Sequence, residues 1–179
     1  MSSPKLFVIT GGPGAGKTTQ IGALAHTGFA VAPEAGRHVI LEQQARGGTA
    51  LPWIDRQAFA QAMLAHDVDS YARLSATSGP VFCDRGIPDV IGYLRLEGIA
   101  VPEAIWRAAR EHRYQERVFI CPPWRAIYAT DSERKQTPEI AEQTYAAMVA
   151  VYSELGYTLT EVPRGPVDTR VKFVREAVS

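Results

Sequence analysis

The chain has 179 residues, of which 46% are hydrophobic and 21% are charged, and its 19 basic and 19 acidic side chains give a formal net charge of zero. This composition excludes a disordered chain, and the balanced charge argues against a nucleic-acid partner held by unspecific attraction. No apolar run approaches the roughly 20 residues of a membrane span and the N-terminus lacks a secretory-signal pattern, so we expect a single cytoplasmic domain over residues 1–179, monomeric or a small homo-oligomer.

Short apolar runs alternate with segments of helical periodicity. The runs indicate buried strands at Leu6–Ile9, Phe29–Val31, Val81–Cys83, Val118–Ile120 and Thr158–Val162. Helices are predicted from Lys17 to His26, from Ile54 to Ser75, after Pro88 and Pro102, from Pro138 to Leu155 and from Asp168 to Val178. Because parallel strands need crossover connections, this alternation predicts a three-layer α/β fold around a parallel sheet.

The first strand runs into a glycine-rich turn that fills the pattern G-x-x-x-x-G-K-[ST]. With the threonine that follows the pattern, the residues predicted to bind nucleotide are Gly11, Gly12, Pro13, Gly14, Ala15, Gly16, Lys17, Thr18 and Thr19. The glycines let backbone N–H groups converge on phosphate oxygens, and the helix that follows directs its positive end at the same anion. Lys17 supplies a charge for the β and γ phosphates, and the Thr18 hydroxyl is placed to coordinate Mg²⁺. The turn therefore predicts a P-loop that binds ATP and Mg²⁺.

Two further strand ends each carry an acid and an arginine. Glu34 and Arg37 follow the second strand, and Asp84 and Arg85 follow the third, so all four belong on the edge of the sheet that bears the P-loop. Asp84 is a candidate second ligand of Mg²⁺, with a helix N-cap as the alternative. Glu34 is a candidate to receive the proton of an attacking hydroxyl or water, with an acid in the first turn of a helix as the alternative. The arginines either pair with these acids or bind a substrate anion.

The segment between the fourth strand and the long helix, approximately residues 124–140, is polar and basic. Its cations Arg125, Arg134 and Lys135 are candidates to neutralise charge on a transferring phosphoryl group. A solvated loop that leads into the helix is the alternative.

Several motifs, taken together in their order along the chain, resemble one family. They are GGPGAGKTT, PEAGR, CDRGIPDVIGYL, PPWRAIYATDSERK and YSELGYTLTEVP. The set is similar to compact "AAA domain" proteins related to nicotinamide-riboside kinase domains, which share the fold of adenylate and deoxynucleoside kinases. The resemblance implies a five-stranded parallel sheet in the order 2-3-1-4-5. It also implies that Glu34, Asp84 and Arg85 lie on the acceptor side, and that Asp131, Arg134 and Lys135 lie in a lid over the phosphates.

The leading interpretation is a small-molecule kinase that transfers the γ-phosphoryl group of ATP to a hydroxyl of a nucleoside-like or other small metabolite. Its predicted catalytic residues are Lys17, Glu34, Asp84, Arg85 and Arg134. The alternative is an ATP- or GTP-binding regulatory NTPase with slow hydrolysis that acts through a protein partner, although the sequence contains no GTPase-type N-K-x-D motif. A nucleic-acid-processing ATPase is disfavoured by the neutral charge.

Overall fold

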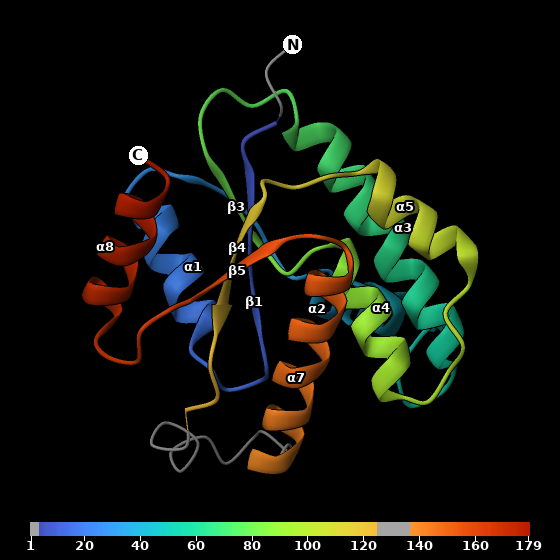
Figure 1. Ribbon diagram of the computed structural model, residues 1–179. Helices are drawn as coiled ribbons and strands as arrows, with labels where there is room; N and C mark the ends of the chain where they lie inside the picture. Colours follow the sequence, from blue (N-terminus) through green and yellow to red (C-terminus); the bar gives the residue numbers. More distant parts are fainter. Residues whose placement is uncertain (1–3, 125–136) are drawn as a thin grey trace.

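A five-stranded sheet covered by helices on both faces forms the centre of the computed structural model, which describes residues 4–124 and 137–179 (Figure 1). Its strands are β1 (Leu6–Gly11), β2 (Ala30–Ala32), β3 (Val81–Asp84), β4 (Arg117–Cys121) and β5 (Thr158–Glu161). The strand order is β2-β3-β1-β4-β5, and each pair of neighbouring strands is parallel. The fold class and the sheet order are therefore confirmed, with strand ends that agree to within one or two residues.

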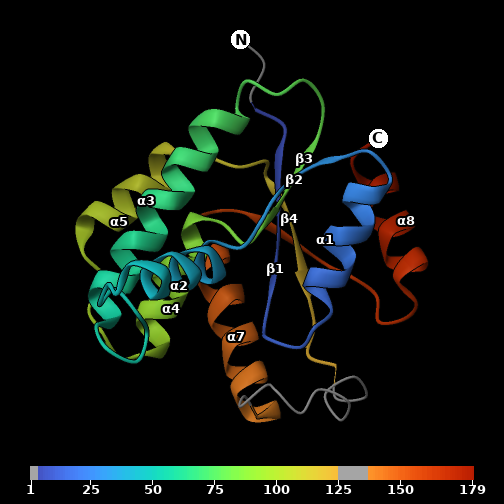
Figure 2. The same ribbon diagram turned by 180° about the vertical axis from the view of Figure 1, so that it is seen from behind.

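The helices form the two outer layers. They are α1 (Lys17–His26), α2 (Ala35–Arg46), α3 (Arg56–Leu74), α4 (Ile87–Leu96), α5 (Glu103–Glu111), α7 (Pro138–Glu154) and α8 (Val167–Ala177). Helices α1 and α8 cover one face of the sheet, and the others lie on the opposite side, as the two views from front and back agree (Figures 1 and 2). The chain thus forms the three layers that the alternation of elements predicts.

Helix α2 is the element that the sequence did not predict. Its buried residues are Ala35, Gly36, Val39 and Gln43, so its core-facing stripe holds one large aliphatic side chain. A helix is recognised in a sequence by apolar residues that recur with its period. Because a glycine and a glutamine occupy two of the buried positions of α2, this recurrence is absent. The helix is nevertheless important for the site, because it begins directly after Glu34.

The sheet separates two apolar cores, and the central strand β1 contributes to both. Leu6 and Val8 pack with α4 and α7, whereas Ile9 packs with residues of α1 and α8. This alternation follows from the period of two in a strand, and it explains why the run is apolar without interruption. Thr10 lies buried on the α4 side of the same strand.

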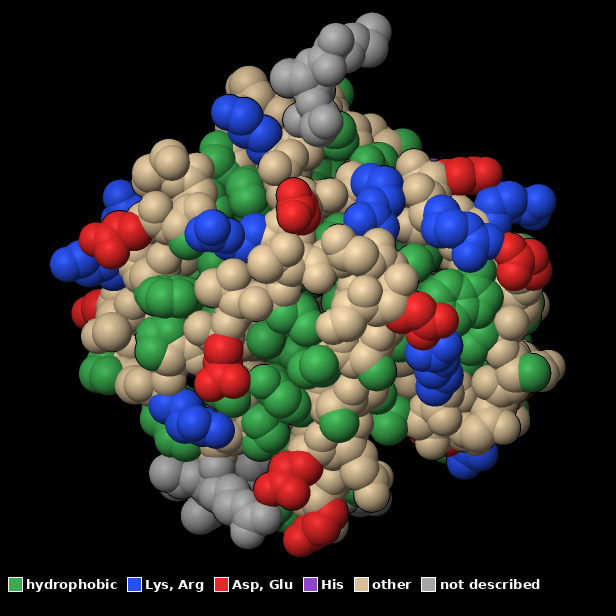
Figure 3. All heavy atoms as spheres, in the orientation of Figure 1, with side chains coloured by type: hydrophobic (Ala, Val, Ile, Leu, Met, Phe, Trp, Pro, Cys, Tyr) green, Lys and Arg blue, Asp and Glu red, His purple; other side chains and the backbone are tan. Residues whose placement is uncertain are grey.

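The surface shows no sector of one charge sign on the face drawn in Figure 3, where basic and acidic side chains are interspersed. This arrangement agrees with the balanced composition of the chain. Among the described residues, no helix is both long enough and apolar enough to cross a membrane.

The turn after β1 is closely packed by the backbone of other elements. A Cβ atom on Gly12 would lie 2.5 Å from the carbonyl oxygen of Ala141 in α7, and a Cβ on Gly11 would meet the carbonyl oxygen of Cys121 in β4. Carbonyl oxygens held in a helix or a strand move little, so these two positions accept only glycine.

We predict that Gly12→Ala lowers the free energy of unfolding by about 1–3 kcal/mol through overpacking against α7. Gly22→Ala in the middle of α1 is the matched control, since a Cβ there meets nothing within 4 Å. That control is expected to stabilise the helix by about 0.5–1 kcal/mol. Urea unfolding without nucleotide measures both, and equal effects of the two substitutions would contradict the packing argument.

Candidate functional site

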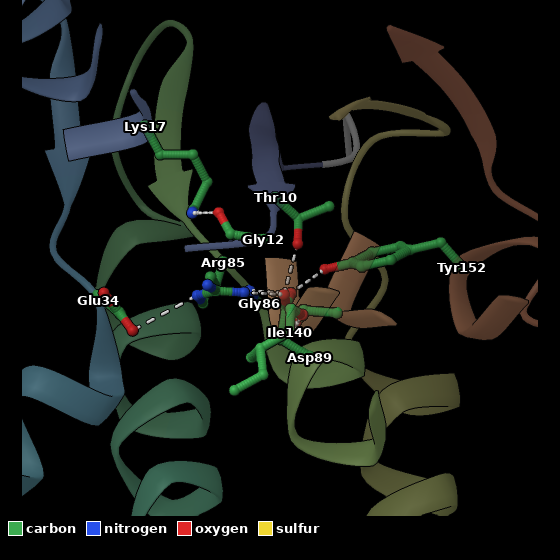
Figure 4. Close-up of polar contacts among 10 residues, drawn as sticks. Thr10, Gly12, Lys17, Glu34, Arg85, Gly86, Asp89, Ile140 and Tyr152 are labelled. Carbon is green, nitrogen blue, oxygen red and sulfur yellow. Dashed lines mark hydrogen bonds and ion pairs between the residues drawn. The ribbon is translucent and has the colours of Figure 1, made fainter. Parts of the chain in front are cut away.

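The glycine-rich turn that the sequence predicts to bind phosphate lies between β1 and α1. Gly14 and Gly16 adopt left-handed backbone, with φ of 70° and 78°. Lys17 begins α1, is buried, and donates from Nζ to the carbonyl oxygen of Gly12 at 2.9 Å (Figure 4). Burial, with the nearby Arg85 guanidinium, lowers the pKa of Lys17 to about 8. An anion bound in the loop would compensate this cost, because it favours the charged form of the lysine.

Arg85 lies opposite the P-loop and has strained backbone. Its φ of 68° makes it the one non-glycine residue with a positive φ among those described. Its guanidinium lies between two acids: Nε is 3.4 Å from Oε1 of Glu34, and Nη1 donates to Oδ1 of Asp89 at 3.2 Å (Figure 4). Strain of this kind costs about 1–3 kcal/mol and is retained where surrounding contacts impose it. Here the two carboxylates hold the guanidinium in place.

Asp89 in α4 is the buried centre of this arrangement. Its carboxylate accepts hydrogen bonds from Thr10 Oγ1 at 2.5 Å, Tyr152 Oη at 2.6 Å and the Gly86 backbone N–H at 2.9 Å, besides the bond from Arg85. Figure 4 shows that these donors converge on it from β1, from α7 and from the turn after β3. The four hydrogen bonds compensate the free-energy cost of burying the carboxylate, and they hold β1, α7 and the turn after β3 together.

Asp84 ends β3 beside the P-loop and is buried, with 7% of its surface exposed. Burial raises its pKa to about 6, partly opposed by the Lys17 charge. Its Oδ1 has no hydrogen-bond partner among the described residues. The residue at the N-cap of α4 is Gly86, so the alternative that Asp84 caps this helix is wrong.

Glu34 occupies the N-cap position of α2, but its side chain accepts no capping hydrogen bond. Instead its carboxylate lies 3.4 Å from Arg85. Glu34 therefore precedes the first turn of α2, so the alternative of an acid within that first turn is wrong.

The residues present fit a magnesium ion. Asp84 offers a buried oxygen without a partner, and Thr18 offers a hydroxyl at the exposed start of α1. Carboxylate and hydroxyl oxygens are the ligands that Mg²⁺ takes in P-loop proteins, together with phosphate oxygens and water.

A cavity of about 1010 Å³ is bordered both by the P-loop and by the acids and arginines that follow β2 and β3. On one side it is lined by P-loop residues, namely Pro13, Gly14, Gly16, Lys17, Thr18 and Thr19. On the other side it is lined by Glu34, Arg37, Arg85 and Asp89. Gly11, Gly12 and Ala15 of the loop are buried, as is Asp84, and none of the four lines this cavity.

Arg170 supports the P-loop from behind, and no motif in the sequence indicates this role. It lies on α8 with 4% of its surface exposed, and its guanidinium donates to the carbonyl oxygens of Ala15 at 3.0 Å and Gly16 at 3.2 Å. It also donates to Gln20 Oε1 at 3.1 Å. By holding these carbonyl oxygens on the far side of the loop, Arg170 favours the orientation in which loop N–H groups face an anion. Its charge adds to the positive potential behind the phosphates.

Three predicted residues cannot be placed. Arg125, Arg134 and Lys135 lie outside the described residues, as do Asp131 and most of the predicted lid. Their assignment to phosphate binding stays a prediction.

Comparisons with known proteins agree with the fold. The model of a family described as "AAA domain" matches residues 6–170. No curated protein matches the sequence. Among solved structures, the chain is similar to NadR protein in complex with NR, at 16% identity and a TM-score of 0.73 over 97% of this chain and 50% of that one. The chain therefore spans half the length of that protein.

Two full-length kinases are also similar in structure. Thymidylate kinase from Ehrlichia chaffeensis matches at 13% identity and a TM-score of 0.65, over 99% of this chain and 100% of the kinase. Deoxyadenosine kinase from M. mycoides matches at 14% identity and a TM-score of 0.62, over 96% and 97%. At such identities the likeness establishes the fold, which is that of P-loop kinases.

Because the pKa of Asp84 is raised in the folded state, we predict that the stability of the ligand-free protein depends on pH. Between pH 3.8 and about 6 the unfolded state loses this proton before the folded state does, so the contribution of Asp84 to stability falls as the pH rises through this window. Asp84→Asn should therefore raise the melting temperature at pH 7.5, by about 2–4 °C for each kcal/mol recovered, and leave it unchanged near pH 4. Calorimetry without ligand checks this, and a lower melting temperature at pH 7.5 would contradict it.

We predict that Arg170→Met weakens both the fold and the nucleotide site. Three acceptors lose a charged donor, so the free energy of unfolding should fall by about 2–4 kcal/mol. Affinity for Mg–ATP should fall roughly tenfold or more, which corresponds to about 1.4 kcal/mol. Lys172→Met on the same helix is the control, because that side chain is 75% exposed. Unchanged ATP affinity in folded Arg170→Met would show that the loop does not need the guanidinium.

Proposed function

The chain belongs to the AAA domain family, and within that family we propose that it is an ATP-dependent kinase acting on a small, nucleoside-like metabolite. The observation that carries the proposal is that one cavity is lined by P-loop residues and also by Glu34 and Arg85. Phosphoryl transfer needs the two reactants in one space with the groups that stabilise charge around them. A protein that only binds nucleotide has no need of the part of the cavity that Glu34 and Arg85 line.

On the donor side, the P-loop N–H groups and Lys17 would hold the β and γ phosphates of ATP. Thr18 and Asp84 would hold Mg²⁺, which neutralises charge on the phosphates when it is bound. Arg134, outside the described residues, is our sequence-based candidate for a further cation over the transferring group.

On the acceptor side, Glu34 would accept the proton of the attacking hydroxyl, and Arg85 would stabilise the charge that develops on the phosphoryl oxygens. The ion pair between them, at 3.4 Å, keeps the carboxylate oriented without using both of its oxygens. Asp89 holds Arg85 from the opposite side and takes no part in proton transfer in this scheme.

The nucleoside-like acceptor is supported by the size and the walls of the cavity. About 1010 Å³ is room for a triphosphate and a second small molecule. Phe59, Met63 and Tyr93 line the part that lies away from the P-loop, and such walls suit a planar ring. Two of the similar structures are described as NadR with NR and as a deoxyadenosine kinase.

We predict that Glu34→Gln lowers phosphoryl transfer by roughly 10²-fold or more, the usual effect of losing a positioned base, while Mg–ATP affinity stays within a few-fold. Glu42→Gln on the same helix is the control, because that acid is half exposed and forms an ion pair along the helix with Arg46 at 3.3 Å. Product analysis with ATP and a panel of nucleosides measures the transfer.

The regulatory NTPase is the competing outcome. If no nucleoside or sugar in the panel is phosphorylated, and the slow release of inorganic phosphate is the same in wild type and Glu34→Gln, the kinase proposal fails. A protein that changes shape with its nucleotide and acts through a partner would then be the better description.

A further inference from the structure

Helix α3 presents one carboxylate to the cavity on an otherwise apolar stripe. Phe59, Met63 and Asp67 follow one another at four-residue spacing, and all three line the cavity. Phe59 and Met63 belong to the apolar core. Residues spaced by four share a helix face, so Asp67 is held on the same wall one turn further along.

Asp67 has little to compensate its burial. Its side chain is 13% exposed, and the one basic side chain within 4 Å of its carboxylate among the described residues is the neighbouring His66, with Nδ1 3.9 Å from Oδ1. That distance is too long for a hydrogen bond. Burial raises the pKa of Asp67; the neighbouring His66 opposes this shift in part, whereas the carboxylates of Asp89 and Glu34 act in the same direction as burial. A buried carboxylate without a donor is costly, so a group that donates to it would bind with a large gain.

A second polar group in the same wall also lacks a partner. The Tyr93 hydroxyl of α4 is buried and makes no hydrogen bond within the described part of the chain. The Tyr93 ring stands edge-on to Phe59, with their centroids 5.5 Å apart. The chamber thus combines aromatic and thioether walls with two unsatisfied polar groups, which is the composition of a site for a heteroaromatic ring.

We propose that Asp67 selects the acceptor by receiving a hydrogen bond from an amino group on its ring. The inference rests on the proposed kinase function and names the class of acceptor: nucleosides whose base carries an exocyclic amine. An ionised carboxylate only accepts hydrogen bonds, so a base with a carbonyl in the same place would set oxygen against oxygen. Sites built around such a buried polar group reject the wrong partner strongly, because the group is then left unpaired.

Two pairs of nucleosides test this directly, because each pair differs mainly in one amine and one carbonyl: adenosine against inosine, and cytidine against uridine. Calorimetry would measure their binding to the protein saturated with a non-hydrolysable ATP analogue and Mg²⁺. For wild type we expect the amine-bearing member of at least one pair to bind about tenfold more tightly or better, the scale of one hydrogen bond to a charged group.

Asp67→Asn should reverse the preference, because its amide can donate to the carbonyl of inosine or uridine. A merely structural aspartate would weaken both members of a pair equally. Asp69→Asn is the matched control on the same helix, since Asp69 is 80% exposed and should leave the preference unchanged. Tyr93→Phe removes only the hydroxyl and should weaken nucleoside binding a few-fold while ATP affinity is kept.

The outcomes separate this inference from the kinase proposal. Equal binding of both members of each pair to wild type, no binding of any of the four, or a preference that persists in Asp67→Asn would overturn the role of Asp67. The wild-type preference needs no variant to fold, so an unstable Asp67→Asn still leaves a decisive result. If the amine-bearing nucleosides bind as expected but ATP yields no phosphorylated product, the kinase proposal fails and the selection by Asp67 stands.

Discussion

The geometry of the site depends on one buried carboxylate. Asp89 joins Thr10 near the end of β1, Tyr152 in the last turn of α7 and the turn that carries Arg85 and Gly86. These groups come from segments far apart in the chain, and each would be an unpaired polar group in the core without it. The same bonds stabilise Arg85 in a backbone conformation that an arginine rarely adopts. Core packing and the placement of the arginine are therefore consequences of a single interaction.

The charges of the site are arranged for a ligand rather than for the free protein. Burial lowers the pKa of Lys17 and raises that of Asp84, so it disfavours the charged form of each side chain. Phosphate groups beside Lys17 and a divalent cation beside Asp84 would reverse both effects. Opposed shifts of this kind in neighbouring groups are typical of functional sites, although the chain as a whole is electrically balanced.

Sequence reasoning found the parts of the site that are local in the chain. The P-loop is one contiguous pattern, and Glu34, Asp84 and Arg85 directly follow apolar strands, so the rule that ligands bind at strand ends was sufficient to select them. The helix-cap alternative for Asp84 was wrong because α4 begins only after Gly86. Helix α2 was missed because the small and polar residues on its inner face carry no apolar period.

Residues that act through tertiary contacts gave no such signal. Asp89 and Tyr152 are 63 positions apart, and Arg170 is 155 positions from Ala15. Asp67 is one of several polar residues on α3, and only the position of the cavity distinguishes it from the exposed Asp69. A pattern in one sequence reports which residues face the core, but not which buried polar groups meet.

The contact between Arg170 and the P-loop also has a temporal consequence. The P-loop is synthesised before the guanidinium that holds its carbonyl oxygens, which is added 155 residues later. At ordinary translation rates of about 5–20 residues per second, that interval is roughly 8–30 s. During it, β1 and α1 can form but the loop lacks its support from α8. The growing chain can therefore complete its P-loop only after α8 has left the ribosome and packed against α1.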